Sequence, residues 1–151
     1  MSQITLKNTI DELISFGTGH TVVNTTNFGD MDKVFSSSIS YPYLRINYRG
    51  TEIEEKRVNY NFQIVCADKK LHDDSDLIDK YSLTEGILQQ LTTYIKYGSR
   101  FKNIWRIEYP IKIYAASSQF IDGACANVLD LTLSVHNALC LSSVQLNGGA
   151  S

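Results

Sequence analysis

Two stretches of the chain alternate between apolar and polar residues, a pattern that predicts β-strands with one apolar and one polar face. The first stretch covers 57–66, and its apolar face carries Val58, Tyr60, Phe62, Ile64 and Cys66. Its opposite face carries Arg57, Asn59, Asn61 and Gln63. In the second stretch, 129–136, leucine and valine alternate with Asp130, Thr132, Ser134 and His136. These two segments are the clearest strands in the sequence.

A further alternating segment precedes the first strand and predicts a long hairpin. Apolar and polar residues alternate over 44–49, and Gly50 begins a break in the pattern. The hairpin is expected to run from about Tyr43 to Cys66. Its loop, 50–55, is acidic and should be exposed, because backbone outside a ladder needs water as a hydrogen-bond partner.

Apolar residues at helical spacing predict a short amphipathic helix near the N-terminus. They follow i, i+4, i+7, i+8 spacing: Leu6, Ile10, Leu13 and Ile14. Thr5 is suited to be the N-cap of this helix, and Gly17 is expected just past its end.

A capping box predicts where a second helix begins. Ser82 and Glu85 stand three residues apart, the spacing at which each side chain can bond the other residue's backbone N–H. The apolar stripe of this helix contains Ile87, Leu88, Leu91, Tyr94 and Ile95. Gly98 is expected to end the helix in a left-handed conformation. Gly86 costs up to about 1 kcal/mol relative to alanine inside a helix, which indicates a close approach of another backbone.

The remaining segments predict shorter strands and complete the expected fold. Ile104–Tyr109 and Ile111–Ala115 are strand pieces separated by Pro110, and proline indicates a sheet edge or a bulge because it has no N–H for a ladder. Another short strand is expected over 21–27. The element order predicts an α+β fold with a mainly antiparallel sheet and a long hairpin, packed against one or two amphipathic helices.

The length and composition favour one folded domain. A chain of 151 residues with 43% hydrophobic and 20% charged residues resembles an ordinary globular protein. Residues 1–141 are expected to form a single α+β domain, and the small, polar segment 142–151 a flexible C-terminal tail. The net charge of −2 creates no whole-chain field that would attract nucleic acid or an anionic membrane. Without a signal peptide or a long apolar run, the protein is expected to act in the cytoplasm of the cell that makes it.

The residues with chemical potential form no recognisable catalytic, cofactor-binding or metal-ligating pattern. The three cysteines lack metal-site spacing and are interpreted as free thiols: Cys66, Cys125 and Cys140. The three histidines also lack such spacing: His20, His72 and His136. Gly17-Thr-Gly19 has no third glycine and follows a helix instead of a strand. The acidic cluster lacks the glycine and terminal glutamate of a calcium loop and is interpreted as a solvated loop: Asp73, Asp74, Asp76 and Asp79.

Aromatic residues near the ends of predicted elements are the candidates for contacts between subunits. Tyrosine and tryptophan are enriched at interfaces, where one end is buried and the other is wet. Five residues have this placement: Tyr41, Tyr43, Tyr97, Trp105 and Tyr109.

Several of these segments together resemble a group of tailed-bacteriophage proteins. They are the run from His20 through Phe28-Gly-Asp30 to Tyr41-Pro42, the polar hairpin strand 58–68, the capped helix, and the closing strand 128–135. The resemblance spans about residues 4–137. It is to neck, head-tail connector and tail-completion (tail-terminator-like) ring proteins, particularly those of phages of Bacteroides-type hosts, including crAss-like phages.

The resemblance implies a structural role without catalysis and without cofactors. Proteins of this group are small α+β subunits that assemble into a closed homo-oligomeric ring, commonly of six or twelve copies. The ring stacks between portal and tail, contacts the adjacent portal, neck or tail proteins, and lets DNA pass through its lumen without sequence-specific binding. The protein is then expected in the virion, assembled in the host cytoplasm, with no membrane partner. The resemblance transfers no defined functional residues.

Two other function classes remain open from the residues alone. One is a soluble small-molecule-binding or regulatory domain with an apolar pocket beneath the helix that starts at Ser82. The other is an enzyme, if His20 or His136 meets an acidic group in the fold.

Overall fold

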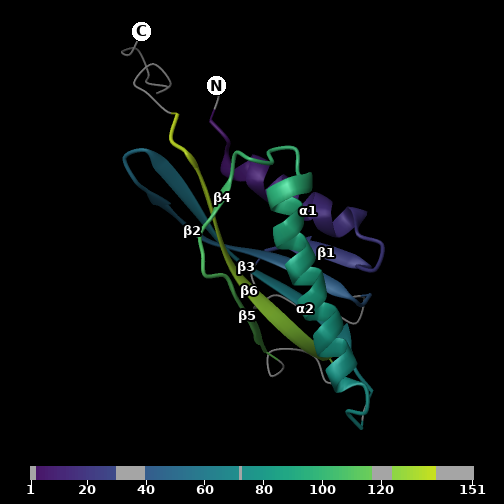
Figure 1. The fold of residues 1–151 in the computed structure, drawn as a ribbon. Coiled ribbons are helices and arrows are strands. Elements are labelled where there is room, and N and C mark those ends of the chain that lie inside the picture. The colour runs from purple at the N-terminus through teal and green to yellow at the C-terminus, as the bar shows by residue number, and fades with distance from the viewer. Residues whose placement is uncertain (1–2, 30–39, 72, 117–123, 139–151) are drawn as a thin grey trace.

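The structure is a computed structural model that describes residues 3–29, 40–71, 73–116 and 124–138. Within these residues six strands form one sheet, and both helices lie on the same side of it (Figure 1). The strand order is β1-β2-β3-β6-β4, and β5 also pairs with β6. The predicted α+β fold with a mainly antiparallel sheet is confirmed.

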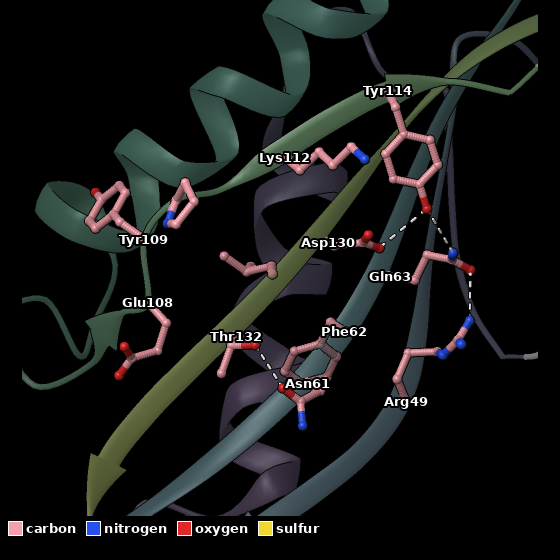
Figure 2. A pocket seen from close by; sticks show the side chains of 12 residues that line it. Arg49, Asn61, Phe62, Gln63, Glu108, Tyr109, Lys112, Tyr114, Asp130 and Thr132 are labelled. Carbon is pink, nitrogen blue, oxygen red and sulfur yellow. Dashed lines mark hydrogen bonds between the residues drawn. The ribbon is translucent and has the colours of Figure 1, made fainter.

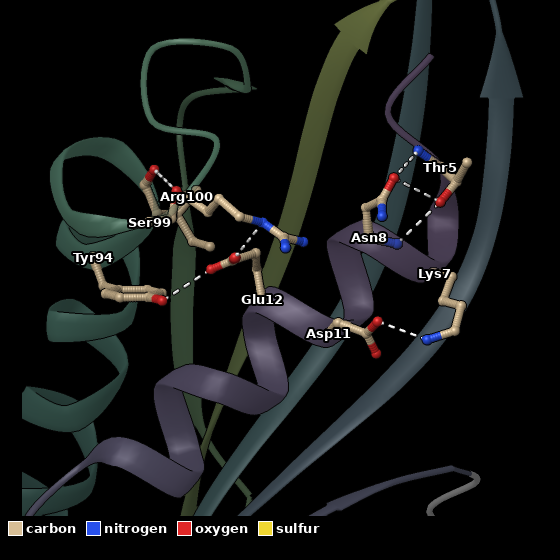
Figure 3. Close-up of polar contacts among 9 residues, drawn as sticks. Thr5, Lys7, Asn8, Asp11, Glu12, Tyr94, Ser99 and Arg100 are labelled. Carbon is tan, nitrogen blue, oxygen red and sulfur yellow. Dashed lines mark hydrogen bonds and ion pairs between the residues drawn. The ribbon is translucent and has the colours of Figure 1, made fainter. Parts of the chain in front are cut away.

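Helix α1 (Leu6–Gly19) begins at the predicted cap. Thr5 Oγ1 accepts a hydrogen bond from the Asn8 backbone N–H at 3.1 Å, and Asn8 Oδ1 accepts one from the Thr5 backbone N–H at 3.0 Å (Figure 3). The predicted end at Gly17 is wrong, because the helix continues for another half turn. Gly17 is instead a buried position where the helix contacts the sheet.

The long hairpin is confirmed, but its loop lies further along the chain than predicted. β2 (Tyr43–Ile53) and β3 (Arg57–Lys69) are antiparallel, with Ile46 opposite Ile64. The expected loop over 50–55 is wrong because β2 continues through Gly50, and only 54–56 lie between the strands. A register shift between Tyr48 and Gly50 inserts one residue, and Gly50 adopts a φ of +136°, so a β-bulge keeps the strand paired.

Three short strands complete the sheet around β6 (Ala124–His136), which pairs antiparallel to β3. β1 (Thr25–Phe28) is parallel to β2, an exception within the otherwise antiparallel sheet. β4 (Arg106–Ile107) and β5 (Lys112–Ala115) both pair with β6 and are separated by a break at Pro110. The predicted break at proline is confirmed, although the first strand piece is shorter than expected.

Helix α2 (Leu77–Thr93) begins five residues before the predicted start at Ser82. The capping-box interpretation is wrong because Ser82 and Glu85 lie inside the helix, where the same spacing occurs without a terminus. The expected close approach at Gly86 is also wrong, since a Cβ added there would meet no atom of the described residues within 4 Å.

The helix then passes into a π-helical turn, η2 (Tyr94–Gly98). Among the described glycines only Gly29 and Gly50 have positive φ, so the predicted left-handed stop at Gly98 is wrong. Ser99 ends the turn, because its backbone N–H bonds the Tyr94 carbonyl at 2.8 Å and its hydroxyl bonds the Ile95 carbonyl at 3.1 Å.

The hydrophobic core lies between the helices and one face of the sheet. The predicted stripe of α2 contributes its buried part to this core: Ile87, Leu88, Leu91 and Ile95. The alternating residues of β3 and β6 supply the opposite wall. Among the described residues no helix is long and apolar enough to cross a membrane. The proposed tail, 142–151, lies outside the described residues, so its flexibility stays a prediction.

Candidate functional site

The helix-free face of the sheet is lined with polar side chains over much of its area. Because successive residues of a strand point to opposite faces, the polar positions of β2, β3 and β6 meet there. They include Arg45, Asn47, Arg49, Asn59, Asn61, Gln63, Asp130, Thr132 and Ser134. At the other end of this face a smaller apolar cluster forms around Tyr43, Val65 and Val128.

A groove of about 460 Å³ opens on this face beside the β4–β5 break (Figure 2). Hydrogen bonds join four of its side chains across four strands. Arg49 donates to Gln63 at 3.3 Å, and the Gln63 amide donates to the Tyr114 hydroxyl at 3.3 Å. The Tyr114 hydroxyl donates to Asp130 at 3.4 Å. Beside this chain, Thr132 donates to Asn61 Oδ1 at 2.7 Å.

The polar network continues from the groove towards the hairpin tip. Arg57 donates to the Ser134 carbonyl at 2.8 Å. The Asn59 side-chain amide donates to Glu54 at 3.4 Å, and Asn59 Oδ1 is buried with no hydrogen-bond partner among the described residues. Amides, hydroxyls and charged groups that bond one another in this way form a surface for hydrogen-bonded contact. They offer no pairing of a nucleophile with a base.

A second polar cluster joins α1 to the π-helical turn (Figure 3). Glu12 is only 7% exposed, and it accepts a hydrogen bond from the Tyr94 hydroxyl at 2.9 Å. Arg100 Nε lies 3.4 Å from the other carboxylate oxygen of Glu12. Burial, and secondly the Glu12 carboxylate, raise the pKa of Tyr94. This buried carboxylate is paired on both oxygens, so the cluster acts as a clamp between two helical segments.

His20 follows the C-terminal end of α1, and His136 is the last residue of β6. Neither histidine forms an ion pair with a carboxylate among the described residues. His20 Nε2 lies 2.6 Å from Gln90 Oε1, and its Nδ1 accepts from the Val22 N–H at 3.1 Å. His136 is exposed at the end of β6. His72 lies outside the described residues. The absence of enzyme activity stays a prediction.

The rejected motifs have local structural roles. Gly17-Thr-Gly19 forms the last turn of α1. In the acidic cluster, Asp76 accepts a hydrogen bond from the Leu71 N–H at 2.8 Å, and Asp73 accepts one from the Ser75 N–H at 3.0 Å. The Ser75 backbone N–H, and secondly the Ser75 hydroxyl, lower the pKa of Asp73. Across the described ranges, no group of three or more histidine, cysteine or acidic residues is placed to hold a metal ion.

Cys66 and Cys125 are buried and unpaired with each other, in agreement with the interpretation as free thiols, and Cys140 lies outside the described residues. Burial, followed by the nearby Asp68 carboxylate, raises the pKa of both described thiols. A raised pKa leaves less thiolate at neutral pH, and the thiolate is the reactive form.

We therefore expect both buried thiols to react with a thiol reagent at least about 10-fold more slowly in the native protein than after unfolding. A Cys140→Ser variant restricts the measurement to these two groups, and the release of a chromophore at pH 8 reports the rate. Fast labelling of the native protein at both positions would contradict the burial seen here.

The five aromatic candidates for subunit contacts divide into two groups. Tyr43 is fully buried and Trp105 is 7% exposed, so both belong to the interior of the subunit. Tyr97 is 63% exposed and Tyr109 is 65% exposed, whereas Tyr41 is half-buried. Tyr97 and Tyr109 remain candidates for contact with a partner.

Sequence reasoning missed the groove because its residues come from separate strands. The alternating pattern indicated the polar faces that carry Asn61 and Asp130. No local signal indicated that Tyr114 of β5 and Arg49 of β2 would join them. A scan against protein-family models finds no matching family, and a search of curated proteins finds no match either.

Proposed function

We propose that this protein is a structural subunit of a tailed-bacteriophage virion. It forms a homo-oligomeric ring around the DNA channel in the neck, head-tail connector or tail-completion region. The phage assignment rests on the resemblance of residues 4–137 described above. The observation that supports an assembling subunit is the one-sided packing of the sheet. Both helices cover one face. The other face carries the polar groove, where Arg49 and Asp130 are exposed and can contact a neighbouring subunit or ring.

The hairpin tip offers a second contact for assembly. In Figure 1 the β2–β3 hairpin extends away from the helices, and all residues over 51–56 are exposed. Ile53 at this tip is 77% exposed. A large apolar side chain at the end of a projecting arm favours a contact between subunits, because burying it removes apolar surface from water.

The ring predicts a specific effect of changing the hairpin tip. We expect native mass spectrometry of the purified protein to show an assembly of six or twelve copies. Ile53→Asp should weaken the assembly by about 10-fold or more, since burying an isoleucine contributes about 1.5–3 kcal/mol. Ile78→Asp is the matched control, because Ile78 is 83% exposed on α2, away from the hairpin.

The hairpin contact and the ring itself can be contradicted by two different results. Equal effects of the two substitutions would remove the hairpin tip from the interface and leave the ring in place. A protein that stays monomeric at high concentration and is absent from purified virions would contradict the ring itself.

A second candidate function is a soluble small-molecule-binding or regulatory domain. The observation that favours it is the groove on the helix-free face. This groove lies elsewhere than the apolar pocket expected beneath α2, where the inward side chains Ile87, Leu88 and Leu91 are buried against the sheet. A small molecule retained through purification and seen by native mass spectrometry would support this function over the ring.

A further inference from the structure

The charge of the chain is strongly uneven. Residues 96–112 contain five basic residues and one acidic residue, Glu108, which gives this segment a net charge of +4. The rest of the chain contains nine basic and fifteen acidic residues, which gives it a net charge of −6. The overall charge of −2 therefore conceals a basic segment, and such local asymmetry indicates an anionic partner.

The charges of this segment are directed to solvent. Lys96, Lys102 and Lys112 are exposed, and no carboxylate of the described residues lies within ion-pairing distance of any of the three. The two arginines of the segment have acidic neighbours: Arg100 lies 3.4 Å from Glu12, and Arg106 lies 3.7 Å from Glu108. The lysines therefore carry most of the uncompensated positive charge.

Exposed aromatic rings lie among these lysines. The Lys96 ammonium lies 5.3 Å from the centre of the Tyr97 ring. The Tyr97 side chain, and secondly Tyr109, raise the pKa of Lys96. Tyr109 lines the groove together with Lys112 (Figure 2). Lys96 and Tyr97 lie in the π-helical turn, and Tyr109 and Lys112 line the groove. We call these four residues the basic edge.

We propose that the basic edge, together with Lys102, contacts the phosphate backbone of nucleic acid without reading its sequence. Lysine ammonium groups on flexible stems bind phosphates as point charges, and exposed tyrosines add hydroxyl donors and stacking faces. The positive charges of the three exposed lysines complement a polymer with one negative charge per about 1.7 Å of duplex. This inference rests on the proposed function in one respect: in the virion, the nucleic acid would be the DNA in the lumen of the proposed ring.

The test measures binding of the full-length protein to fluorescently labelled duplex DNA at low salt and at increasing salt. The variant Lys96→Gln, Lys102→Gln, Lys112→Gln removes the three exposed lysines. The control Lys7→Gln, Lys56→Gln, Lys69→Gln removes three exposed lysines elsewhere and changes the net charge equally. Circular dichroism and thermal unfolding confirm that both variants remain folded.

The first variant should bind duplex DNA at least about 10-fold more weakly than the unaltered protein at low salt, and the control should bind nearly as well as the unaltered protein. The slope of log affinity against log salt should become shallower by about 3 in the first variant only. Tighter binding of single-stranded than duplex DNA would assign part of the contact to the tyrosine rings and would also support the proposal.

Three outcomes would overturn it. The unaltered protein could fail to bind DNA at low salt, or both variants could weaken binding equally, which would indicate a general charge effect. The protein could also bind poly-glutamate and not DNA, which would assign the basic edge to an acidic protein partner. Native mass spectrometry of the same samples reports the ring separately, so a ring without DNA binding removes only this inference.

Discussion

Gly17→Ala should destabilise the protein by about 1–3 kcal/mol, although alanine is normally the better helix residue. A Cβ at position 17 would lie 2.3 Å from Thr26 Oγ1, 2.6 Å from Thr26 Cγ2 and 3.0 Å from Leu44 Cδ2. The two separations from Thr26 are shorter than atomic contacts allow, so either the Thr26 side chain or α1 would have to shift. Urea unfolding followed by circular dichroism measures the free energy of unfolding.

Gly86→Ala is the control for this substitution. Gly86 also lies inside a helix, but an added Cβ there meets no atom within 4 Å in the part of the chain that the structure describes. This variant should therefore gain up to about 1 kcal/mol of stability. Adding Thr26→Ala to Gly17→Ala should recover part of the lost stability, because it removes the two nearest clashing atoms. A gain in stability from Gly17→Ala, like that expected from Gly86→Ala, would contradict close packing of α1 on the sheet.

Leu91→Ala should destabilise the protein by about 2–5 kcal/mol. Leu91 is fully buried on the inward face of α2, within the core formed with β3 and β6. Truncation removes apolar contacts and leaves a cavity that the surrounding side chains fill only in part. The same unfolding measurement gives the value.

Ile78→Ala is the control on the same helix. The Ile78 side chain is 83% exposed, so its truncation should change stability by no more than about 0.5 kcal/mol. The comparison also bears on the ligand-binding alternative. A small cost at Leu91 would indicate space beneath α2, as an apolar pocket there requires.

The elements that were predicted correctly are those with a strong local signal. The alternation over 57–66 and 129–136 identified β3 and β6, because a strand between core and solvent imposes a period of two on its side chains. Thr5 identified the start of α1, because its side chain bonds a backbone group only three residues away. Pro110 identified the break between β4 and β5, because a missing N–H acts at its own position.

The wrong predictions concern features that have more than one local explanation. A glycine near the end of an apolar helix pattern can be a C-cap or a point of contact, and Gly17 proved to be the second because Thr26 and Leu44 approach it. Ser82 and Glu85 have capping-box spacing, yet the preceding turn of α2 is already helical. The break in alternation at Gly50 predicts a loop, whereas the pairing of β2 with β3 continues through this residue as a bulge.

Local patterns were thus sufficient for the fold class, the long hairpin, the two-faced strands and the buried stripe of α2. Such patterns arise because burial against one surface repeats with the period of the helix or strand. The groove, the Glu12 clamp and the parallel pairing of β1 with β2 depend on contacts between segments distant in the chain. Glu12 and Tyr94, for example, are 82 residues apart. A contact over such a separation leaves no periodic signal, so only the folded arrangement of the chain reveals these features.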